Sequence, residues 1–300
     1  MSNPVMNSVA QNFQQVTPAG YPHMPGYQVN SQQPLGGQMA RMEPGQQTLR
    51  ETDFSQIEAA YWGTSADAVD QGRLTYDDII MKTSILFGIL VLITAGAWNV
   101  VTQNPSLGIV FSLVGGLGSF VLALVNSFKT KVSPVAVMAY AVCEGLFLGA
   151  FSQVMDAHYP GVVAQAVVAT IAVFAVMLVL FKSGKVRYTS KMAQILLIGT
   201  GGIMLYYLLN LGLQLTGVLS NPWGLSGLTV MGIPLGVVVG LLAIGLGAFS
   251  LVGDFHIAQY GVENGAPAVF AWKVAFGFMV TVVWLYVEIL RLLAILRSDD

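Results

Sequence analysis

The sequence predicts an all-α integral membrane protein, a bundle of seven transmembrane helices preceded by a disordered N-terminal tail. Its composition is 55% hydrophobic and only 9% charged, whereas a soluble domain is typically about a quarter charged. From Tyr76 onward, long apolar runs repeat, each near the roughly 20 residues that cross about 30 Å of hydrocarbon. Such a chain has too few polar groups to cover its surface as a water-soluble monomer.

Residues 1–75 form the predicted cytoplasmic tail, which is rich in Gln, Pro, Gly, Asn and Met and has no helical or strand periodicity. Because it cannot bury enough apolar surface to offset its ordering entropy, we expect it to be disordered. A Gln/Pro-rich tail that binds a partner is the alternative, and residues 54–63 have the pattern of a short amphipathic helix on the membrane. The tail lacks a basic n-region followed by an apolar h-region, so the first span is expected to direct insertion.

Residues 76–300 form the predicted transmembrane domain. Helices are expected because only a helix satisfies its own backbone in lipid, and the apolar runs lack strand alternation. The predicted spans are 80–101, 106–127, 133–153, 160–181, 192–214, 232–256 and 276–296. Small residues recur every four positions within them, which predicts closely packed helices; the examples are Gly232, Gly236 and Gly240, and Gly145 and Gly149.

The charges in the connectors predict the orientation of the bundle. Residues 182–191 contain four Lys/Arg and residues 129–131 contain two, whereas the alternate linkers near 103, 157 and 220 contain none. By the positive-inside rule, the N-terminus faces the cytoplasm. Seven crossings place the C-terminus outside, yet Arg291 and Arg297 lie near it, so the sequence alone leaves that side open.

Several function classes have no support in the sequence. There is no basic stripe for nucleic-acid binding, and no Gly-rich phosphate loop, CxxC or HExxH. His23, His158 and His256 fall in separate regions and predict no metal site. The lone Cys143 lacks a base suited to activate it, so we expect no enzymatic activity.

Three acidic residues lie inside or at the edges of the spans: Glu144, Asp254 and Glu288. Each costs roughly 2.5–3.5 kcal/mol or more if it is charged at mid-bilayer, so each is a functional candidate. The structural alternatives are a protonated Glu144 bonded to a neighbouring helix, a solvated Asp254 at the cytoplasmic edge, and an ion pair of Glu288 with Arg291 one turn away. Arg291 is also able to extend toward the outer interface.

Three segments resemble the Bax inhibitor-1 family, also called the transmembrane BAX inhibitor motif family. They are "AYAVCEGLFLGAF" in the third span, "VGDFHIAQYG" at the end of the sixth and "WLYVEILRLLAIL" in the seventh, and the resemblance covers about 76–300. It implies a seven-helix bundle with the last helix near its centre. It also implies a bacterial protein of the plasma (inner) membrane that leaks calcium under the control of pH.

The resemblance further implies that a carboxylate on the sixth helix shares a hydrogen bond with one on the seventh. Asp254 matches the first, and Glu288 stands where the family usually has Asp, which adds a methylene. In near bacterial relatives, a basic residue at the end of the second helix pairs with the sixth-helix aspartate. Lys129 is the nearest match for this latch and Lys131 the second choice; a lysine lacks the bidentate fork of arginine.

A shared proton between Asp254 and Glu288 provides a mechanism. The pair is expected to retain one proton near neutral pH, and its loss leaves two anions whose repulsion shifts the bundle to another state. The same oxygens suit transient binding of Ca²⁺. The mechanism requires the sixth helix to continue past Asp254, to about Tyr260, and both carboxylates to lie at similar depth. His256 is either a modulator near neutral pH or a bystander.

The predicted function is a pH-sensitive calcium (cation) leak channel or transporter that needs no cofactor and interacts with lipid, Ca²⁺ and protons. The alternative is a non-conducting regulatory protein that binds other membrane proteins or a membrane protease. A proton-coupled transporter also fits intramembrane carboxylates. An intramembrane enzyme has least support, since the sequence offers no nucleophile–base set.

Overall fold

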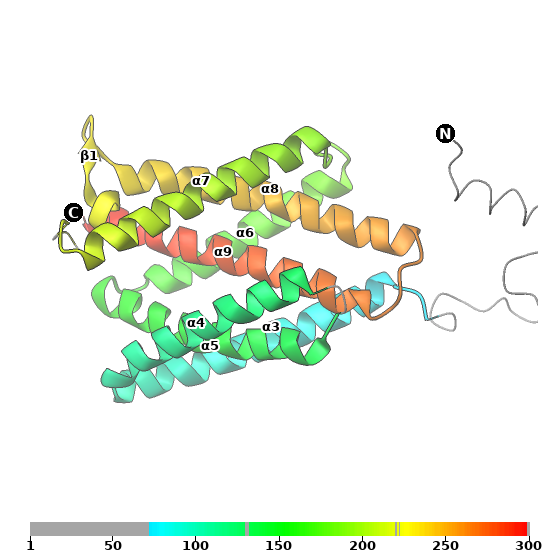
Figure 1. The fold of residues 1–300 in the computed structure, drawn as a ribbon, viewed down its shortest axis with the longest axis horizontal. Helices are drawn as coiled ribbons and strands as arrows, with labels where there is room; N and C mark the ends of the chain where they lie inside the picture. The colour runs from blue at the N-terminus through cyan, green and yellow to red at the C-terminus, as the bar shows by residue number, and fades with distance from the viewer. Residues whose placement is uncertain (1–71, 130–131, 220, 222, 299–300) are drawn as a thin grey trace, which may run out of the picture. The chain divides into compact units, whose positions relative to one another are not determined.

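A computed structural model describes residues 72–129, 132–219, 221 and 223–298 of the chain. Each of seven long helices there is long and apolar enough to cross a membrane, which confirms the predicted fold class (Figure 1). The helices are α3 (Tyr76–Gln103), α4 (Ser106–Phe128), α5 (Pro134–His158), α6 (Val162–Lys182), α7 (Ser190–Leu215), α8 (Leu235–Glu263) and α9 (Phe270–Ser298).

Most of the predicted tail, including residues 54–63, lies outside the described residues. Its last residues are ordered, contrary to the prediction. Leu74 is 1% exposed, and its backbone N–H donates to the carbonyl of Ala266 at 2.7 Å. Thr75 then caps α3 by accepting a hydrogen bond from the backbone N–H of Asp78. The membrane domain therefore begins a few residues before Tyr76.

Consecutive helices run in opposite directions, so the described chain starts at one end of the bundle and finishes at the other (Figure 1). Helix α9 is the most buried, since more than half of its most apolar stretch is enclosed. It packs against α3, α5, α6 and α8. Helix α7 is the least enclosed, and Ile203 is the residue that it buries.

A short hairpin precedes α8. Strands β1 (Thr229–Val230) and β2 (Ile233–Pro234) pair antiparallel after the 3₁₀ turn η1 (Gly224–Gly227). Met231 and Gly232 join the strands with left-handed φ values of 54° and 84°, as in the tight turns that suit the twist of a hairpin. Helix α8 therefore starts at Leu235, and Gly232 lies in the turn rather than in the helix where it was predicted.

Helices α8 and α9 extend further than their predicted spans. Helix α8 continues to Glu263, beyond the predicted end at 256, and α9 begins at Phe270 rather than at 276. The added turns of α8 are amphipathic: Ala258 and Gly261 are buried, whereas Tyr260 is exposed. Hydropathy alone ends a span at the first polar residues, but this helix remains packed beyond them.

The antiparallel α8–α9 interface has a regular arrangement. From Gly240 to Gly261, α8 has a glycine at every seventh position except one. Each of these glycines packs against a large side chain of α9. The facing pairs are Gly240 with Leu292, Gly247 with Leu285, and Gly261 with Phe270. Asp254 occupies the remaining position of this row. The interval of seven keeps one face of α8 toward α9 along its whole length.

Candidate functional site in the membrane domain

Asp254 lies in the α8–α9 interface. At this level of the interface the glycine belongs to α9 and the larger side chain to α8. A Cβ atom added at Gly277 of α9 would lie 3.3 Å from Oδ1 of Asp254. The hydroxyl of Thr281, one turn further along α9, donates to Oδ2 at 2.6 Å. Gly277 thus makes room for the carboxylate and Thr281 orients it. Because α8 continues well past Asp254 to Glu263, the predicted extension of this helix past Asp254 to about Tyr260 is confirmed.

No basic side chain neutralises Asp254 in the described part of the chain, where the ion pairs are Lys82–Asp78 and Arg291–Glu288. Asp254 is half-buried rather than solvated at an edge. Its oxygens therefore have a hydroxyl partner but no fixed counter-charge, which is unusual for a carboxylate inside an interface between helices.

Glu288 is 4% exposed and belongs to a different cluster. The hydroxyl of Tyr207 on α7 donates to its carboxylate and lies 2.8 Å from both oxygens. Nη2 of Arg291 donates to Oε2, also at 2.8 Å, and to the Tyr207 hydroxyl. The guanidinium carbon lies 4.4 Å from the centre of the Tyr207 ring. The intrahelical ion pair is therefore present, with a tyrosine of α7 as its third member.

The predicted hydrogen bond between Asp254 and Glu288 is wrong for this structure. Thr281, which holds Asp254, precedes Glu288 by two helical turns on nearly the same face of α9, or about 10 Å along the axis at 1.5 Å per residue. Leu285 lies between these levels; it is fully buried, and its Cδ2 would be 2.8 Å from a Cβ atom on Gly247. At that separation the two carboxylates share neither a proton nor a Ca²⁺ ion.

The error has a definite physical cause. The family resemblance implied a hydrogen bond between the two carboxylates, which required them to lie at similar depth, whereas the predicted spans left a long connection between 256 and 276. The connection is in fact tight, and Gly261 faces Phe270. In an antiparallel pair this register places Glu288 beside the Ile244 region of α8, and Ile244 packs in the cluster that contains Ile289 and Leu290.

Glu144 on α5 is 7% exposed. Its polar neighbours are the hydroxyl groups of Ser119 on α4 and Tyr140 on α5 itself. The ring of Tyr140 meets that of Phe276 edge-on, with centroids 5.1 Å apart. The polar neighbours of Glu144 therefore come from α4 and from α5 itself. This placement agrees with the structural alternative, in which a neighbouring helix supplies its polar contacts.

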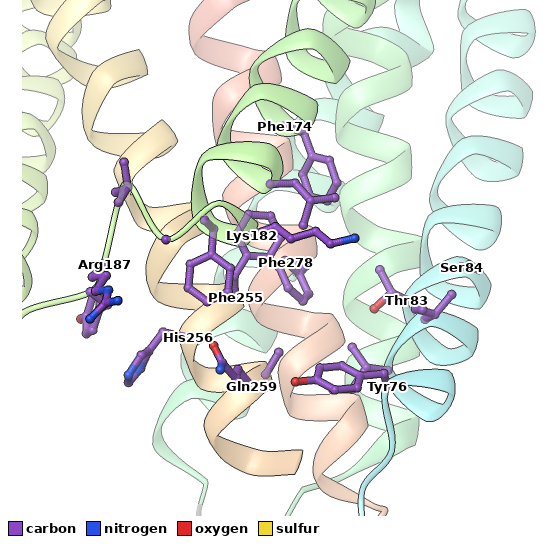
Figure 2. Close-up of a pocket in the computed structure, with 18 of the residues that line it drawn as sticks. Tyr76, Thr83, Ser84, Phe174, Lys182, Arg187, Phe255, His256, Gln259 and Phe278 are labelled. Carbon is purple, nitrogen blue, oxygen red and sulfur yellow. The ribbon is translucent and has the colours of Figure 1, made fainter. Parts of the chain in front are cut away.

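The remaining candidates lie toward the end of the bundle where α3 begins. The ring of His256 faces Tyr188, with centroids 5.3 Å apart, and lines a hollow beside α6 (Figure 2). Lys129 is exposed just after α4, near Lys273. It forms no ion pair with Asp254, so the predicted latch through Lys129 is wrong for this structure. Lys131 lies outside the described residues.

Sequence reasoning missed Tyr207 and Thr281, the partners of the two acids. A signal was present for Tyr207: the apolar run of α7 is interrupted by Tyr206, Tyr207 and Asn210. All three have partners, because Tyr206 shares a 2.9 Å hydrogen bond with Ser226 and Asn210 accepts one from the backbone of Leu225 at 2.7 Å. Thr281 offered no comparable signal, since threonine is common in membrane helices.

The site consequently has two polar levels on one face of α9, separated by an apolar layer. The first level combines the carboxylate of Asp254 with the hydroxyl of Thr281, which are oxygen ligands of the kind that hard cations prefer. The second level is the neutralised cluster of Glu288, Arg291 and Tyr207. Leu285 on Gly247 forms the layer between them.

A protein-family model described as Bax inhibitor 1 like matches residues 3–298 of the chain. The match takes in nearly the whole sequence, whereas the motif resemblance began near residue 76, so it also includes the predicted tail. A search of curated proteins found no match.

Proposed function

Because the chain belongs to the Bax inhibitor-1 like family, we propose that it is a cation leak channel or transporter with Ca²⁺ as its main ion. The observation that carries this proposal is the carboxylate of Asp254. It lies inside the α8–α9 interface, holds a hydroxyl partner and has no cation paired with it among the described residues. An intramembrane anion without a fixed counter-charge attracts mobile cations.

Glu288 has another role in this proposal. Arg291 neutralises its charge and Tyr207 fixes its position, so it attracts a passing cation weakly. Leu285, packed on Gly247 between the two levels, acts as the apolar barrier of a closed state, since hydrophobic constrictions exclude hydrated ions. Ions cross when α8 and α9 separate at this layer.

The proposed pH sensor is Asp254 alone rather than a carboxylate pair. Protonation removes its charge and with it the attraction for a cation. Flux is therefore expected to rise with pH over the range in which Asp254 loses its proton. The carboxamide of Asp254→Asn keeps the shape of the side chain without its charge, so this variant is expected to lose the pH dependence.

Liposomes that contain a Ca²⁺-sensitive dye test the proposal when the full chain is reconstituted in them across a series of pH values. We expect flux that rises with pH in the wild type and falls close to that of empty vesicles in Asp254→Asn. Glu263→Gln is the matched control, because it removes an acid from the last turn of the same helix and is expected to keep the flux. Wild-type flux no greater than that of empty vesicles would refute the leak, and an unchanged Asp254→Asn would refute the sensor.

We also propose that the end where α3 begins faces the cytoplasm of a bacterial cell, with the bundle in its plasma membrane. The described basic residues at this end are Arg73, Lys82, Lys129, Lys182, Lys185, Arg187, Lys191 and Lys273, whereas Arg291 and Arg297 lie toward the other end. The positive-inside rule supports this orientation. In a Cys143→Ser background, an impermeant maleimide applied to whole cells should label His158→Cys and leave Ser183→Cys unlabelled; the reverse pattern contradicts the orientation.

A second candidate function, a non-conducting regulator of other membrane proteins, draws support from α7. This helix buries Ile203 alone, and a Cβ atom added at Gly201, Gly202 or Gly212 would meet nothing within 4 Å. Small residues on an open helix face allow another helix to approach closely. Two observations would together favour this function over the leak. The wild type would show no Ca²⁺ flux, and a membrane protein would co-purify with the wild type but not with Gly202→Leu.

A further inference from the structure

A large hollow lies between α3 and α6, at the end of the bundle where α3 begins. It measures about 1270 Å³, more than the roughly 300–1,000 Å³ of pockets for small molecules. It exists because α6 ends at Lys182, whereas α3 and α8 continue on either side (Figure 2). Helices α3 and α6 both pack against α9 but hardly touch each other, which leaves the gap between them open toward the lipid.

The floor of the hollow is aromatic. Phe174 and Phe255 lie with ring centroids 5.5 Å apart, Phe255 and Phe278 lie 5.3 Å apart, and Phe181 joins them at 5.5 Å from Phe255. Ile79 of α3 adds a buried aliphatic side chain to the lining. Water gains few hydrogen bonds on such a surface, so hydrocarbon is the favoured filling.

The rim of the hollow is basic and polar. Lys182 extends across the gap toward Thr83 and Ser84 of α3, and Arg187 lies on the α8 side near His256 (Figure 2). No Asp or Glu is among the described residues that line it. The Thr83 hydroxyl is buried without a hydrogen-bond partner in the described part of the chain.

Three acids lie near the rim, Asp77, Asp78 and Glu263; Asp77 is exposed, and the other two have partners of their own. Asp78 forms an ion pair with Lys82 at 3.1 Å. Glu263 accepts a hydrogen bond from Gln259 at 2.7 Å and is exposed. None of the three pairs with Lys182 or Arg187, and the described residues contain no ion pair that involves either cation. The positive charge at the rim is therefore available to a ligand.

We propose that this hollow binds an anionic phospholipid, with one acyl chain on the phenylalanine floor and the headgroup at the basic rim to which Lys182 and Arg187 contribute from opposite sides. The combination of an apolar floor that opens to the bilayer and a cationic rim at its polar edge matches such a lipid. Basic residues near a membrane surface attract anionic lipids, each by roughly fivefold in affinity.

The test measures how much phosphatidylglycerol the full chain retains in detergent by native mass spectrometry, with phosphatidylcholine and inorganic phosphate as separate probes. Lys182→Gln with Arg187→Gln should weaken retention of phosphatidylglycerol by about 25-fold, since two contributions of about fivefold multiply. The matched control is Lys185→Gln with Lys191→Gln, which removes two charges outside the hollow, one from the α6–α7 connector and one from the first turn of α7, and should change retention little. An equal loss in both variants would mean general electrostatic attraction and would overturn the site.

Ser84→Trp examines the apolar part of the hollow, because it fills space at the α3 side and leaves both cations in place. We expect weaker retention of phosphatidylglycerol in this variant. Unchanged retention in this variant would overturn the proposal. It would also be overturned if the wild type retained phosphatidylcholine equally well, or if inorganic phosphate competed as well as the lipid. A photoreactive side chain at Ser84 identifies the occupant directly: a lipid adduct supports the proposal, and a crosslink to residues 1–71 overturns it in favour of the chain's own N-terminal segment.

Discussion

Removing the hydroxyl of Tyr207 should loosen α7 from the rest of the bundle. Helix α7 buries Ile203 alone, so its attachment depends unusually on polar contacts, and the contact of Tyr207 with Glu288 and Arg291 is the charged one among them. Tyr207→Phe keeps the ring over the guanidinium and removes only the hydroxyl. The change therefore isolates the hydrogen bonds from the packing.

The size of the loss follows from the burial of Glu288. A hydrogen bond to a charged group contributes about 1.5–3 kcal/mol in soluble proteins, whereas polar pairs between membrane helices average about 0.6 and reach about 1.7 kcal/mol. Glu288 is 4% exposed and the hydroxyl is 2.8 Å from both of its oxygens. We therefore expect a loss near the upper membrane value, about 1.5 kcal/mol in the free energy of unfolding.

Tyr206→Phe is the matched control on the same helix, because its hydroxyl bonds the neutral Ser226 at 2.9 Å; we expect a loss of about 0.6 kcal/mol. Unfolding in mixed micelles with increasing SDS measures both losses. A double-mutant cycle with Glu288→Gln should give a coupling of about 1 kcal/mol between Tyr207 and Glu288. A loss for Tyr207→Phe no larger than that for Tyr206→Phe, or zero coupling, would refute the reasoning.

Three further outcomes are expected. Gly149→Ala should lower stability by about 1–3 kcal/mol, since its Cβ would lie 2.6 Å from a backbone oxygen of α3. Its control, Gly96→Ala, has nothing within 4 Å of the added Cβ and should be neutral or up to about 1 kcal/mol more stable. Equal thermal unfolding of the two variants would contradict the packing argument. Gly277→Ala should reduce Ca²⁺ flux without removing a charge, because its Cβ would lie 3.3 Å from Oδ1 of Asp254; wild-type flux would count against an ion site at that oxygen. Thr281→Val removes the hydroxyl that donates to Asp254 and should displace the pH profile of the flux, so a profile identical to that of the wild type would show that this bond does not influence the sensor.

The helices themselves could be predicted from local composition. A segment in hydrocarbon must satisfy its own backbone, so each apolar run of about 20 residues predicts a helix without reference to its neighbours. For this reason α4 was predicted within one residue of its observed end at Phe128. Ends that remain helical through packing, such as that of α8 at Glu263, are not visible to hydropathy.

The cost of a buried charge is likewise a property of the residue, so Glu144, Asp254 and Glu288 could be identified as candidates from their positions in apolar runs. Which groups meet them is a property of the register between helices. The fit of Leu285 to Gly247 and of Asp254 to Gly277 sets that register through contacts between residues distant in the chain. By itself, the sequence determined the seven membrane helices and the acidic residues whose charge is unfavourable inside them. The tertiary structure decided that Asp254 meets Thr281 and that Glu288 meets Tyr207 and Arg291. The reason is that a shift of two turns between packed helices leaves the composition unchanged but gives each side chain different neighbours.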